Sequence, residues 1–203
     1  YLMQRPFLHI VLSAPEMFGF MKGQPARIRK IGYEPVIISS ASEKLDECAK
    51  ADAMKRLTVS ILRPISLWHD AKTFYQLCQI FRQDSPQAVM LSGPKAIFLG
   101  SMAAWVCQIP RRIIIYHGMR QENLKGPLRW ILDACVKISF AAASTALTVS
   151  PSLRELLISR KLCSADKIEA IRPGTPNGID IDKYSPTPEL LHATMALKDS
   201  LGI

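Results

Sequence analysis

Short runs of β-branched and aliphatic residues alternate with longer segments of helical periodicity along this chain of 203 residues. The runs show little apolar–polar alternation, which is typical of strands covered on both faces of a sheet. They predict strands at Phe7–Leu12, Pro35–Ser39, Leu57–Leu62, Ala88–Leu91, Arg112–Tyr116, Ala146–Val149 and Ile168–Ile171. The segments between them predict helices near residues 25–31, 43–54, 67–84, 95–108, 126–143 and 151–162.

A strand followed by a helix, repeated six times, predicts an α/β fold: a doubly wound parallel sheet of about seven strands with helices on both faces. The pattern stops where prolines and glycines become frequent, between Arg172 and Pro188, and Glu189–Leu201 then predicts a last helix. We therefore expect a Rossmann-like domain over residues 1–172, and an interdomain loop with a terminal helix over residues 173–203.

The formal net charge of +9 favours an anionic partner, which by this argument alone is nucleic acid, anionic lipid or a phosphorylated substrate. No apolar run is long enough to span a bilayer, and Phe7–Leu12 lacks the cleavage site of a signal peptide. The cysteines are odd in number and form no CxxC or Cys/His cluster, which argues against a disulfide framework and a zinc site. We expect reduced, mostly buried thiols in or near helices, and a cytosolic protein. The five are Cys48, Cys78, Cys107, Cys135 and Cys163.

Ligands of an open parallel sheet bind beyond the carboxyl ends of its strands, so the loops after the strands hold the candidate residues. Gly23 lies in the first of these loops, Lys95 begins a helix where a cation and free N–H groups suit an anion, and His117 ends a strand before a glycine. Neither GxGxxG nor the P-loop pattern GxxxxGK[ST] is present. His9, inside the first strand, is expected to be a core histidine with its hydrogen bonds satisfied.

Six motifs in order resemble the N-terminal domain of bacterial family 4 glycosyltransferases of the GT-B fold, the type that builds surface polysaccharides. They are Met21–Pro25 with Gly32–Val36, Arg63–Ser66, Ser92–Ala96, Tyr116–Glu122, Ser150–Leu153 and Asn177–Asp180. The resemblance implies transfer of a hexose from a nucleotide-sugar, expected to be a UDP-sugar, with retention at the anomeric carbon. The acceptor would be a lipid-linked or growing glycan.

The resemblance also implies roles for individual residues. His117 matches the histidine that faces the donor sugar, and is the expected catalytic residue. Substrate-binding roles are expected for Gly23, Gln24, Lys95, Gly118, Arg120, Glu122, Ser150 and Asn177. No metal or other cofactor is expected, because basic side chains and helix dipoles would stabilise the leaving diphosphate. The family's donor-binding residues lie in a C-terminal domain beyond this chain, so the fragment alone is expected to be inactive.

Two alternatives stay open. A GT-B UDP-sugar epimerase has the same sheet but is expected to use several carboxylates at the strand ends, where this chain is richer in basic residues. A non-catalytic basic α/β module would bind membrane or nucleic acid. No nucleic-acid-binding motif is present, however, and nucleic acid is not expected as a partner. An anionic membrane surface is compatible with the transferase, which would then be cytoplasmic and peripheral on the inner face of the membrane.

Overall fold

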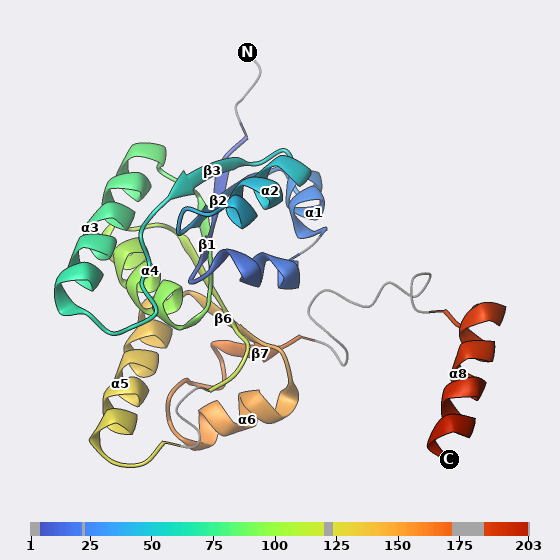
Figure 1. Cartoon of the computed structure of the whole chain (residues 1–203). Helices are drawn as coiled ribbons and strands as arrows, with labels where there is room; N and C mark the ends of the chain where they lie inside the picture. Colours follow the sequence, from blue (N-terminus) through green and yellow to red (C-terminus); the bar gives the residue numbers. More distant parts are fainter. Residues whose placement is uncertain (1–4, 22, 120–123, 172–184, 203) are drawn as a thin grey trace.

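A computed structural model describes residues 5–21, 23–119, 124–171 and 185–202 (Figure 1). Its centre is a sheet of seven parallel strands in the order β3-β2-β1-β4-β5-β6-β7. The predicted α/β class and doubly wound parallel topology are confirmed. The strands are β1 (Phe7–Leu12), β2 (Glu34–Ser39), β3 (Lys55–Thr58), β4 (Ala88–Ser92), β5 (Arg111–Tyr116), β6 (Thr145–Thr148) and β7 (Ile168–Ala170).

Helices cover both faces of the sheet and enclose two separate hydrophobic cores. One core lies under the short 3₁₀ helix η1 and helices α1 and α2, and includes Ile10, Ile37 and Leu45. The larger core lies under α3, α4, α5 and α6, and includes Leu77, Leu91 and others. The helices are η1 (Pro15–Met21), α1 (Gln24–Lys30), α2 (Glu43–Ala51), α3 (Leu67–Asp84), α4 (Pro94–Val106), α5 (Pro127–Ala142), α6 (Pro151–Ser159) and α8 (Pro188–Leu201).

The bounds of one strand were predicted wrongly, and one short helix was not predicted. The third strand was expected at Leu57–Leu62, but β3 pairs with β2 only over Lys55–Thr58. The apolar residues Val59 and Ile61 are buried beyond the end of the strand, so their burial does not come from the sheet ladder. The short helix is the seven-residue η1, which lies in the loop after β1.

The cysteines and His9 lie where the sequence predicted them, but the hydrogen bonding of His9 differs from the prediction. All five thiols are free, and Cys48, Cys78 and Cys163 are buried. His9 is fully buried, with Nε2 at 3.1 Å from Asp84 Oδ2. The two groups are not aligned for a hydrogen bond, and in the described part of the chain Nδ1 also lacks a partner. The prediction that His9 is a core residue is confirmed, but the prediction that its hydrogen bonds are satisfied is wrong.

Among the described residues, no helix is both long and apolar enough to cross a membrane. The expected boundary between a domain at 1–172 and a linker from 173 falls on residues outside the described part, so it stays a prediction. In α8, which follows that segment, no residue is buried.

Candidate active site

The loops after β1 and β4 meet at the point where the strand order reverses. These neighbouring strands lead the chain in opposite directions along the sheet, which leaves a crevice at their carboxyl ends. The Ser13 backbone N–H donates to the Ser92 carbonyl at 3.0 Å. Ser13 Oγ accepts a hydrogen bond from the Ala96 N–H, in the first turn of α4, at 2.8 Å. The first loop is therefore bonded to both ends of the second.

Gly93 permits this close approach. Its backbone has φ +90° and ψ 151°, a region that is almost restricted to glycine. A Cβ at this position would lie 2.6 Å from Met17 Sδ and 2.6 Å from Ser13 Oγ. Glycine is thus required both for the turn into α4 and for the contact with the first loop.

His117 lies directly after β5, beside this junction. Its Nε2 is 3.0 Å from Ser92 Oγ, and either atom is the donor, depending on the tautomer. Its ring centroid is 5.1 Å from that of Phe20 in η1, which is 54% exposed. Burial lowers the pKa of His117 below its usual value of 6.5, so the imidazole is neutral at pH 7. A neutral, half-buried imidazole held on one side is suited to hydrogen-bond a sugar hydroxyl.

Lys95 is nearby but its ammonium already has partners. Nζ donates to Asp70 Oδ1 and to the Pro64 carbonyl, each at 2.5 Å. The lysine therefore holds the loop between β3 and α3 against the start of α4. Its predicted contact with an anion stays a prediction, and these two contacts use two of the three N–H donors of the ammonium.

The other predicted binding residues are spread along the same edge of the sheet. Gly23, with φ +79°, precedes α1, and Gln24 is the first residue of that helix. Gly118 follows His117 and is exposed. Ser150 is the N-cap of α6, where its Oγ accepts a hydrogen bond from the Leu153 N–H at 3.2 Å. Arg120, Glu122 and Asn177 lie outside the described residues, and all these binding roles stay predictions.

Three residues at this site were not predicted as site residues from the sequence. They are Ser13, Ser92 and Phe20, which bond to the loop junction or contact the His117 ring. Both serines come at the end of a strand, and that position is the signal that could have identified them. It becomes informative only once β1, β4 and β5 are known to be neighbours.

The site forms an open edge of the sheet. In the described part of the chain, one cavity lies between α5 and α6 and another lies among α3, α4 and α5, and His117 lines neither of them. In the same part of the chain, no group of three or more His, Cys, Asp or Glu side chains is placed to hold a metal ion. The predicted independence from metal stays a prediction.

Comparison with known sequences identifies relatives among glycosyltransferases. The family Glycosyltransferase Family 4 matches residues 26–183. The capsular polysaccharide biosynthesis glycosyltransferase CapM of Staphylococcus aureus is 29% identical over 176 residues, which are 87% of this chain and 45% of that protein. The UDP-Gal:alpha-D-GlcNAc-diphosphoundecaprenol alpha-1,3-galactosyltransferase of Escherichia coli is 26% identical over 63% of this chain and 32% of its own length. The chain thus spans less than half of either relative.

Solved structures share the fold at lower identity. UDP-GlcNAc 2-epimerase from Neisseria meningitidis, bound to UDP-GlcNAc, superposes with a TM-score of 0.65 at 19% identity, over 84% of this chain and 47% of that one. The Anabaena protein HepE in complex with UDP gives a TM-score of 0.64 at 15% identity, over 97% and 50%. At this identity the likeness concerns the fold alone.

Proposed function

The chain belongs to glycosyltransferase family 4, and we propose that it is the acceptor-binding half of a retaining hexosyltransferase. In this proposal the donor is a UDP-sugar and the acceptor is a lipid-linked or growing polysaccharide. The names of two relatives support these substrate classes. The Escherichia coli enzyme is named for a UDP-galactose donor and a diphosphoundecaprenol acceptor, and the Staphylococcus aureus enzyme is named for capsular polysaccharide.

The observation that carries the proposal is the environment of His117. Its imidazole lies at the carboxyl edge of the sheet, beside the reversal of strand order, and Ser92 holds its Nε2 at 3.0 Å. Burial keeps it neutral by lowering its pKa. In the proposed complex, a second domain binds the UDP-sugar and presents the sugar to this edge, where the other ring nitrogen of His117, Nδ1, hydrogen-bonds a hydroxyl.

The leaving diphosphate needs positive potential during transfer. The α4 N-terminus, which directs the positive end of the helix dipole at this edge, is one source in the described chain. We propose that it acts with basic residues of the second domain and that no metal is required. His117 orients the donor sugar, and this orientation accelerates transfer by positioning the anomeric carbon for reaction.

Hexose transfer from a labelled UDP-sugar to a lipid-linked acceptor tests the proposal. The measurement compares this chain with a version extended past Ile203 by a nucleotide-sugar-binding domain. We expect turnover only in the extended protein, and a fall in kcat of roughly 10²-fold or more in its His117→Ala variant. His192→Ala, which removes an exposed imidazole from α8, is the matched control. Turnover by the short chain, or an unchanged kcat without His117, would contradict the assignment.

A UDP-sugar 2-epimerase is the second candidate, because solved epimerases share this fold. Conversion of UDP-GlcNAc to its C2 epimer by the extended protein, with no acceptor present, would favour it over the transferase. The curated sequence relatives favour the transferase, since both are named as glycosyltransferases.

A further inference from the structure

Large apolar side chains are exposed mainly on one side of the molecule. Five of the 18 exposed large hydrophobic side chains in the described residues lie on α8, and eleven of the other 13 lie between residues 62 and 138. That segment includes α3, α4 and α5, which cover one face of the sheet. All three tryptophans of the chain are among them: Trp68 is 91% exposed, Trp105 61% and Trp130 74%.

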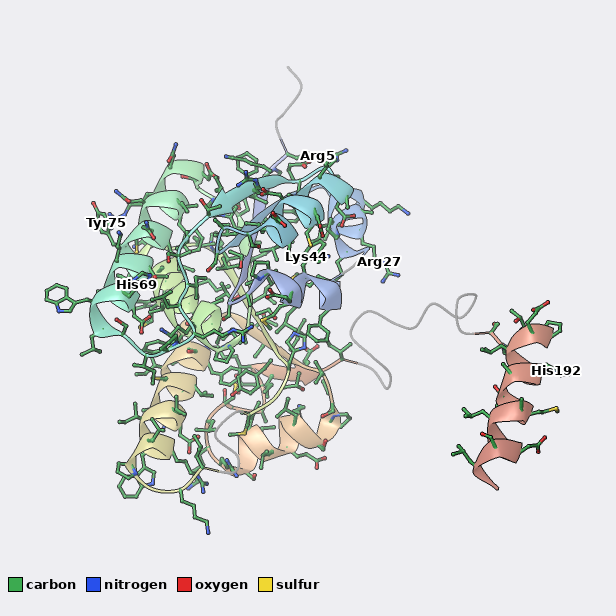
Figure 2. All side chains as sticks on the ribbon, viewed as in Figure 1. Arg5, Arg27, Lys44, His69, Tyr75 and His192 are labelled. Atoms are coloured by element: carbon green, nitrogen blue, oxygen red, sulfur yellow. The ribbon has the colours of Figure 1, made fainter. Side chains whose placement is uncertain are left out.

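The three helices share one continuous surface. α4 packs between α3 and α5, and a groove of about 680 Å³ is lined by residues of all three helices, including Phe74, Trp105 and Ile138. We call the outer side of α3, α4 and α5 the tryptophan face. Figure 2 shows Tyr75 projecting from α3 away from the sheet, on the outer side of that helix.

Lysines alternate with the aromatic residues along this face. Trp68, Lys72 and Tyr75 follow at intervals of four and three residues, so they share the outer side of α3. Trp130 and Lys137 are seven residues apart on the outer side of α5. Lys72 and Lys137 are both exposed. This arrangement combines an apolar surface with cationic groups that can reach beyond it.

The carboxylates of these helices are already in contact with cations. Asp70 pairs with Lys95, and Asp133 lies 3.7 Å from Arg129. Asp84, at the end of α3, lies 3.3 Å from Lys55. Among residues 62–119 and 124–142 no other carboxylate occurs. The face therefore combines exposed indoles with a net positive charge.

We propose that the tryptophan face docks on an anionic phospholipid bilayer. Indole rings partition to the boundary between headgroups and acyl chains, where one part of the ring is apolar and the N–H stays hydrated. Exposed lysines are attracted to anionic headgroups. α3 and α5 both begin at the carboxyl edge of the sheet, so docking brings that edge to the membrane surface. The significance of placing this edge at the membrane rests on the proposed function, whereas the docking itself does not.

Intrinsic tryptophan fluorescence reports on this face directly, because the tryptophan face carries all three tryptophans of the chain. The protein is mixed, without nucleotide-sugar, with vesicles of phosphatidylcholine containing about 30% phosphatidylglycerol, and brominated lipids serve as quenchers. We expect the emission to shift to the blue and to be quenched. Binding should weaken at high salt and on vesicles of phosphatidylcholine alone.

Variants distinguish this face from adsorption of a basic protein anywhere on its surface. Trp68→Ala/Trp130→Ala should lower the vesicle partition coefficient roughly tenfold or more, whereas Ile31→Ala, 70% exposed beyond α1, should not. Lys72→Gln/Lys137→Gln should weaken binding more than Lys30→Gln/Lys50→Gln, which removes the same charge from the other side. Circular dichroism confirms that each variant is folded.

Three outcomes would overturn the proposal. They are the absence of vesicle binding, equal losses in the two lysine pairs, and a stable dimer in sedimentation velocity that buries the tryptophans and prevents quenching. If vesicle binding fails while the extended protein still transfers hexose to a water-soluble acceptor, the docking proposal fails alone. If vesicles bind and no hexose is transferred, only the function proposal fails.

Discussion

Replacing Gly93 with alanine tests whether the site depends on the close approach of two loops. The backbone at Gly93, with φ +90° and ψ 151°, is a conformation that costs a residue with a Cβ about 1–3 kcal/mol. The new Cβ would also lie 2.6 Å from Ser13 Oγ and from Met17 Sδ, so Ser13 has to move. That movement breaks its hydrogen bond to the buried Ala96 N–H, which costs about 1–3 kcal/mol more.

Gly126 provides the matched control. It also precedes a proline at a helix start and has φ +79° and ψ −165°, but a Cβ there would meet no atom within 4 Å. Gly126→Ala should therefore carry the backbone cost alone, and Gly93→Ala should be less stable than it by about 1–3 kcal/mol. Urea unfolding monitored by circular dichroism measures both, provided that the m-values agree. Equal losses of stability in the two variants would refute the close-approach argument.

Two further predictions concern ionisable groups. Burial lowers the pKa of His9 from 6.5 to about 4, so the unfolded chain takes up its proton first as the pH falls. Stability should fall between pH 6.5 and about 4, by at most about 3 kcal/mol, and His9→Leu should lack this part of the slope in urea titrations; an unchanged slope would contradict it. Lys95→Met should destabilise the fold by about 1–3 kcal/mol in thermal unfolding, because the partly buried Asp70 loses its cation. Full stability with lost activity would instead indicate that Lys95 serves the substrate.

The parallel sheet and most helix bounds could be predicted because local patterns encode them. The run Phe7–Leu12 is β1 residue for residue, and the predicted helix at 67–84 is α3. The third strand was misplaced because β3 is at the edge of the sheet and has only one neighbour. Its residues Lys55 and Arg56 are exposed, so an apolar run is not the signature of this strand.

The chain's own sequence determined that a doubly wound sheet forms and that the loops after its strands gather at the carboxyl edge. It also determined that His117 lies in one of these loops. Only the tertiary structure decided which loops meet there. Ser92 and His117 are 25 residues apart, and they are in contact because β4 and β5 are hydrogen-bonded neighbours. The same holds for the pairing of Lys95 with Asp70 and for the exposed tryptophans. Local periodicity sets which residues share a side of a helix, but whether that side is covered depends on what packs against it.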